Sequence, residues 1–111
     1  MLNNIKMNVI QTAANGIVNH ETHFYFQQDG NNVKAHYSGG KIKQGYLVGT
    51  VQKATLTFTY CQLRIDGTQD HGESTCKISL NEANNKLQLV EEFAMQTNNV
   101  TELGVNIFQE V

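Results

Sequence analysis

The chain has 111 residues, a formal net charge of −2 and two cysteines. That length suits one domain spanning residues 1–111 with a modest core and no disulfide framework. The eight basic residues are scattered, which argues against nucleic-acid binding and against a basic membrane patch, since both need clustered positive charge. Residues 1–6 lack the features of a signal peptide, and no segment approaches the ~20 apolar residues of a membrane span, so we expect a cytoplasmic protein.

Turn-forming pairs recur along the chain, which contains no proline. Asn-Gly, Asp-Gly and Gly-Gly pairs adopt the positive φ that hairpin turns need. The pairs are Asn15-Gly16, Asp29-Gly30, Gly39-Gly40, Asp66-Gly67, Asn84-Asn85 and Asn98-Asn99. This spacing predicts an antiparallel meander, with residues 66–72 as its loosest connection. We place the strands at residues 5–12, 17–27, 33–38, 41–51, 54–65, 73–80, 86–96 and 102–111.

Alternating apolar residues predict an inward face on each strand. Within 17–27 the inward residues are Val18, His20, Thr22, Phe24 and Phe26. Gly45 and Gly49 face inward in 41–51, where glycine favours tight curvature at a barrel corner. In 54–65 the apolar phase changes near Cys61, which indicates either a bulge or a strand end that extends past the core.

Eight strands in 111 residues match the size of a minimal up-and-down barrel. Such a barrel is either filled by side chains or just wide enough for one small ligand, and its closure removes exposed sheet edges. The sequence therefore predicts an all-β fold, a single small antiparallel barrel of the lipocalin or avidin type. A flattened sandwich of two meander sheets is the alternative.

The segment 37–49 reads Tyr-x-Gly-Gly-x-Ile-x-x-Gly-x-Leu-x-Gly. It resembles the corresponding segment of small bacterial conserved hypothetical proteins, some of which carry the automatic label N-acetylglutamate synthase, and the resemblance extends almost end to end. Phe93 and Met95 stand where that family often has Trp-x-Trp, and Gln62 where it often has histidine. A synthase of the usual kind binds its cofactor's pyrophosphate at a glycine-rich loop that opens a helix. Gly39-Gly40 lies between two predicted strands instead, so the sequence does not support that activity.

Glu91 shares the inward face of 86–96 with apolar residues. Since an unpaired buried carboxylate is costly, Glu91 must be paired, hydrogen-bonded, protonated or hydrated. One interpretation makes it the anchor of a small polar or amphipathic ligand inside the barrel, and the other places it in a structural polar cluster or at a wet barrel mouth. The residues expected to share a ligand site with Glu91 are Tyr37, Tyr60, Gln62, Thr22, His20, Phe24 and Phe93.

The cysteines and histidines carry no metal or catalytic motif. Cys61 and Cys76 lack Cys-x-x-Cys spacing. If the hairpin is centred near Thr68-Gln69 they lie opposite each other, where two reduced thiols are favoured over a disulfide. His20 and His23 fall on opposite strand faces, while His23 and His36 could meet across a hairpin. We expect no metal site and no cofactor.

These observations favour a non-enzymatic barrel that binds a small molecule in its lumen. The alternative is a structural or interaction protein with a filled barrel, which pairs with another chain or forms a homodimer through outer residues such as Tyr25, Ile17 and Tyr46. An enzyme is the weakest interpretation, because Glu91 as acid or base would need a second group that the sequence does not identify.

Overall fold

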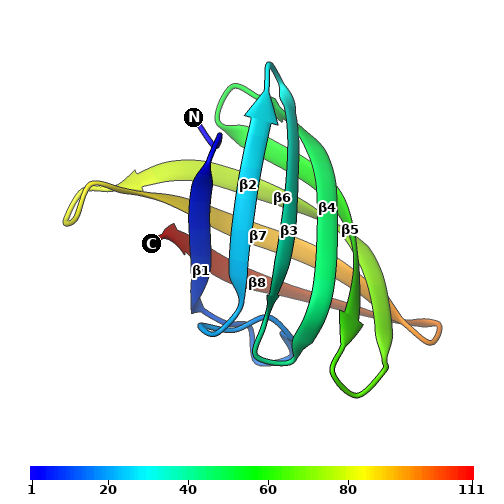
Figure 1. Cartoon of the computed structure of the whole chain (residues 1–111). Helices are drawn as coiled ribbons and strands as arrows, with labels where there is room; N and C mark the ends of the chain where they lie inside the picture. The colour runs from blue at the N-terminus through cyan, green and yellow to red at the C-terminus, as the bar shows by residue number, and fades with distance from the viewer.

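Eight antiparallel strands close into one barrel in the computed structural model, which describes all 111 residues (Figure 1). Each strand pairs with the next one along the chain, and β1 pairs with β8 to complete the ring. The strands are β1 (Ile5–Gln11), β2 (His23–Asp29), β3 (Asn32–Gly39), β4 (Ile42–Gln52), β5 (Thr55–Arg64), β6 (Gln69–Asn81), β7 (Lys86–Thr97) and β8 (Val100–Glu110). The predicted up-and-down barrel is confirmed, and the two-sheet sandwich was the wrong alternative. No helix has the length and apolar character needed to cross a membrane.

The start of β2 differs from the prediction. β2 begins at His23, so residues 12–22 form a long connection after β1. Side chains compete with the strand ladder here: Thr22 Oγ1 accepts a hydrogen bond from Asn19 N at 3.1 Å, and Asn19 Oδ1 accepts one from Glu21 N at 2.8 Å. These local bonds form a turn where the apolar alternation predicted extended chain.

The start of β6 differs as well. β6 begins at Gln69, so most of the stretch predicted as a loose connection is strand. The turn before it is short because Asp66 Oδ1 accepts a hydrogen bond from Thr68 N at 2.9 Å, while Gly67 adopts a φ of 91°.

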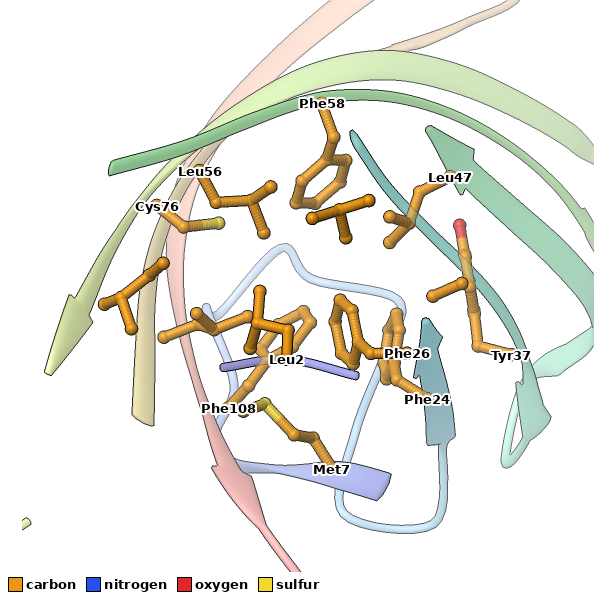
Figure 2. Close-up of a cluster of buried hydrophobic side chains, with 14 of the residues drawn as sticks. Leu2, Met7, Phe24, Phe26, Tyr37, Leu47, Leu56, Phe58, Cys76 and Phe108 are labelled. Atoms are coloured by element: carbon orange, nitrogen blue, oxygen red, sulfur yellow. The ribbon is translucent and has the colours of Figure 1, made fainter. Parts of the chain in front are cut away.

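Apolar side chains fill the barrel at the end that carries the β2–β3, β4–β5 and β6–β7 connections. Figure 2 shows Leu2, Met7, Leu56 and Cys76 pointing into this interior, and all four have no exposed surface. They belong to one cluster of 18 buried residues. The alternation that predicted the inward faces of β3, β5 and β7 is confirmed by their burial patterns.

The two cysteines do not lie opposite each other. Cys61 pairs across the sheet with His71 and is exposed, whereas Cys76 pairs with Leu56 and is buried. The hairpin is centred near Asp66, earlier than predicted. The β5–β6 register has no bulge at Cys61; the nearby irregularity lies in β4, between Ile42 and Gln44. Gln62 stays buried in the inward phase set by Leu56 and Phe58, so the alternation continues along β5 and Cys61 lies on its outer face.

We predict that the folded protein reacts with dithionitrobenzoate at one thiol and the unfolded protein at two. Cys61 is exposed, while Cys76 is fully buried and burial raises the pKa of its thiol, so little reactive thiolate forms there. Colour release before and after unfolding in denaturant measures this, and Cys61→Ser should abolish the native reaction. Rapid reaction of both thiols in the folded protein would contradict the structure.

His23 and His36, which could have met across the β2–β3 hairpin, are not direct cross-strand partners. His23 pairs with Ser38, and His36 instead stacks on the Tyr25 ring with centroids 5.0 Å apart. No group of three or more His, Cys, Asp or Glu side chains is placed to hold a metal ion.

Candidate functional site

A pocket opens into the barrel at the end opposite Leu2 and Met7, and it is lined in part by other members of the 18-residue cluster. Figure 1 shows the long β1–β2 connection at this end, beside the β3–β4 and β5–β6 turns. The pocket measures about 350 Å³ with its open mouth included, but only about 30 Å³ of it admits the centre of a water molecule. A volume of that size holds a water or a few waters, so side chains fill most of the lumen. The lining residues are Ile17, Val18, Phe24, Tyr37, Phe58, Tyr60, Gln62, Glu91, Phe93, Met95, Asn106 and Phe108.

Glu91, on β7, is the only charged residue that lines this pocket. Its side chain is buried, with 4% of the residue exposed. Oε2 accepts a hydrogen bond from Ser74 Oγ at 2.6 Å and Oε1 accepts one from Asn106 Nδ2 at 2.9 Å. Burial raises the pKa of the Glu91 carboxyl above its ordinary value, and these two hydrogen bonds oppose the shift. The carboxylate thus has hydrogen-bond donors but no positive partner.

Asn106, on β8, connects Glu91 to the β1–β2 connection. While its Nδ2 donates to Glu91, its Oδ1 accepts a hydrogen bond from Ala13 N at 2.8 Å. The same connection places Ile17 and Val18 against the pocket. At its far end Thr22 Oγ1 donates to the Gly39 carbonyl at 3.1 Å. We call residues 12–22 the lid, since they cover the pocket and are fixed at both ends.

We predict that Asn106→Ala lowers the free energy of unfolding by about 1–3 kcal/mol, because the substitution leaves a carboxylate oxygen of Glu91 and the amide of Ala13 without partners. Amide hydrogen exchange in the lid should accelerate more than exchange elsewhere. Asn32→Ala is the matched control, since Asn32 is exposed and its side chain makes no hydrogen bond. Equal exchange rates in the lid of both variants would contradict the assigned role of Asn106.

A second polar cluster adjoins the pocket. Tyr37 Oη donates to Gln62 Oε1 at 2.8 Å, and Gln62 Nε2 donates to Asp70 Oδ2 at 2.9 Å. Arg64 Nε and Nη2 donate to the same carboxylate at 3.0 and 2.9 Å, and Thr97 Oγ1 also donates to it. Burial raises the pKa of Asp70, but the hydrogen bonds from Arg64, Thr97 and Gln62 outweigh it and hold the pKa below its ordinary value. This chain of bonds fixes the Tyr37 hydroxyl at the pocket wall.

Four aromatic rings of the pocket each lie opposite a glycine on the neighbouring strand. A Cβ atom built on these glycines would come within 2.3–2.8 Å of the facing aromatic side chain, so only glycine lets the rings lie against the barrel wall. The pairs are Tyr37 with Gly45, Phe58 with Gly49, Tyr60 with Gly72, and Phe93 with Gly104. The register of β4 is regular from Gln44 to Gln52, so no bulge lies at Gly45 or Gly49. Both glycines instead let an aromatic residue of the neighbouring strand lie close to the β4 backbone.

The structure brings together six of the eight residues predicted to form the site. Glu91, Tyr37, Tyr60, Gln62, Phe24 and Phe93 all line the pocket. Thr22 is buried, but it belongs to the lid and bonds to backbone. His20 is exposed, and its carbonyl accepts a hydrogen bond from Asn8 Nδ2 at 3.4 Å. Its inward placement was wrong because residues 17–22 lie outside any strand, with a turn at residues 20 and 21, and strand alternation does not apply there.

Sequence reasoning missed Asn106 and Asp70. Asn106 shares the inward face of its strand with Phe108. A polar side chain on an apolar face needs a partner, so the argument made for Glu91 could have identified Asn106 as well. Asp70 fell in the predicted loop before residue 73, where no strand phase was assigned. Both residues acquire their partners through cross-strand register, which the sequence of one strand does not contain.

The closed eight-stranded antiparallel barrel and the pocket at one of its ends place this chain among the small up-and-down barrel proteins. The sequence matches the model of a family described as avidin-like protein over residues 1–111, and the chain belongs to that family. Among solved structures it is similar to that of the rhizavidin–biotin complex, with a TM-score of 0.72 and 17% sequence identity over 96% of this chain and 98% of that chain. No curated protein matches the sequence significantly. The likeness confirms the avidin-type barrel.

Proposed function

We propose that this chain is a non-enzymatic binding protein whose barrel lumen takes one small ligand, with Glu91 as its polar anchor. The observation that carries the proposal is a buried carboxylate that lines an apolar pocket and has no positive partner. Burial without a counter-charge costs stability, and perturbed titratable groups cluster at functional sites. Rhizavidin, whose barrel is similar, forms a complex with biotin, which supports a ligand in a barrel of this shape.

The size of the pocket limits the ligand. Pockets for drug-sized molecules are about 300–1,000 Å³, whereas this lumen admits the centre of a water molecule over only about 30 Å³. A fragment-sized ligand therefore fits best, and it enters by displacing lumen water and by moving the lid residues Ile17 and Val18 at the mouth. Biotin would require a larger rearrangement of the same residues.

Ligand-observed NMR tests the proposal with fragments of about ten non-hydrogen atoms or fewer, in cationic, neutral and anionic sets, together with biotin. We expect at least one fragment to bind the lumen and Glu91→Gln to weaken it about tenfold, since a hydrogen bond to a charged group contributes ~1.5 kcal/mol or more. Glu92→Gln is the control, because Glu92 is exposed on the outer face of β7. If crystals soaked with every set and with biotin hold only water in the lumen, the proposal fails.

A second candidate function is self-association through the outer face. Val48, Leu103 and Val105 are 61%, 71% and 44% exposed and line one open hollow across β4 to β8. Exposed apolar patches of this kind favour protein contacts. Of the outer residues predicted for such a contact, Tyr25 and Tyr46 are exposed, whereas Ile17 lines the lumen pocket. Sedimentation equilibrium decides the matter: a homodimer that Leu103→Asp converts to a monomer supports this function, and a monomeric wild type excludes it.

A further inference from the structure

Half of the 12 residues that line the pocket are aromatic. Phe24 packs against Tyr37 and Phe108 with ring centroids 4.3 and 4.5 Å apart, and Phe58 meets Tyr60 edge to face at 6.1 Å. With Phe93, these make six aromatic side chains around one small space. The faces of aromatic rings carry partial negative charge and attract cations within about 6 Å.

No positively charged side chain accompanies Glu91 in the pocket. No lysine, arginine or histidine lines the pocket, and the one ion pair of the structure joins Arg64 to Asp70. Cys76 lies opposite Glu91 on β6, and Tyr60 and Tyr37 line the same pocket from β5 and β3. Burial raises the pKa of all three groups, so they stay neutral and supply no positive charge. Ser74 and Asn106 donate hydrogen bonds to Glu91 but are neutral.

We propose that the lumen ligand is a small organic cation, an ammonium group or its methylated form, held between the Glu91 carboxylate and the aromatic wall. The inference rests on the proposed binding function and names its ligand class. An anion would be repelled by Glu91, and a neutral donor would satisfy the carboxylate without using the electrostatics of the rings. A cation uses both features, and it supplies the counter-charge that the folded chain lacks.

Two probes of the same shape separate charge from size. tert-Butylammonium and tert-butanol differ only in the group that would meet Glu91. We expect the wild type to bind the ammonium at least about tenfold more tightly, because an ion pair in a low-dielectric site is stronger than a neutral hydrogen bond. Isothermal titration should show that Glu91→Gln removes this preference and that Glu92→Gln retains it.

A third probe isolates the rings. Tetramethylammonium has no N–H group, so its binding depends on charge and on the aromatic faces. We expect Phe93→Leu to weaken tetramethylammonium about three- to tenfold, the range of a cation–π contact, and to change tert-butanol binding less. Phe93→Tyr keeps an aromatic ring at this position, so it should bind tetramethylammonium about as tightly as the wild type does. Thermal unfolding of both variants verifies that the barrel is intact.

The outcomes distinguish this inference from the function on which it rests. If neutral or anionic fragments bind the lumen and the two ammonium probes do not, the binding function stands and the cation inference is overturned. Equal affinity for tert-butylammonium and tert-butanol overturns it as well. If no probe of any charge binds the lumen, both proposals fail.

Discussion

Replacing Asp70 by alanine is expected to lower the free energy of unfolding by about 3–5 kcal/mol, the range for removing one partner of a buried ion pair. The Asp70 side chain has no exposed surface, while that of Arg64 is 21% exposed. The substitution leaves the Arg64 guanidinium without its carboxylate and deprives Gln62 and Thr97 of their acceptor. Urea unfolding followed by circular dichroism at neutral pH measures the loss.

Glu82→Ala is the control for this substitution, because Glu82 is exposed and its side chain makes no hydrogen bond or ion pair. Its effect should stay within about 0.5 kcal/mol, as for most surface substitutions. If Asp70→Ala costs no more than the control, the cluster does not stabilise the fold.

The pH dependence of the same group has a definite sign. Hydrogen bonds hold the pKa of Asp70 below its ordinary value in the folded chain. A carboxyl with a depressed folded pKa contributes stability that is present above its unfolded pKa of about 3.9 and is lost as pH falls through the folded value. The wild type should therefore lose stability in this acid range more steeply than Asp70→Asn. Parallel curves for the two proteins would show that Asp70 is not the group responsible.

The barrel could be predicted because its signals are local. Turn pairs such as Asp29-Gly30 set the hairpins, and two-residue alternation set the inward faces. Residues 17–22 departed from prediction because the side chains of Asn19 and Thr22 bond to nearby backbone. Local alternation carries no information about that competition.

The candidate site was predictable in part for the same reason. Glu91 and Tyr37 were assigned inward positions from the phase of their own strands, and both line the pocket. Asn106 and Asp70 take part through partners 15 and 8 residues away in sequence, which depend on strand register. Tyr60 lies opposite Gly72 because the β5–β6 hairpin is centred near Asp66. A hairpin centred a few residues further along the chain would pair each of them with a different residue.

The glycines opposite the pocket rings differ in what a methyl group would meet. At Gly45 the nearest atoms belong to the Tyr37 ring, the closest at 2.3 Å. At Gly49 the nearest is the Thr57 carbonyl oxygen at 2.0 Å, followed by Cβ and Cα of Phe58 at 2.6 and 2.7 Å. A side chain can shift to relieve a clash, but backbone moves only if the strand pairing of β4 with β5 is disturbed.

Gly49→Ala is therefore expected to lower the free energy of unfolding by about 3 kcal/mol, the upper part of the usual range for overpacking. Gly45→Ala should cost less stability but displace the Tyr37 ring and weaken binding in the lumen. Denaturant unfolding and probe titration of both variants measure these effects. Gly30→Asn is the control, because Gly30 has a φ of 60° and open space around it, a conformation that asparagine adopts readily. A Gly49→Ala variant as stable as this control would mean that β4 and β5 do not approach as closely as the structure shows, and that the wall behind Phe58 has room to spare.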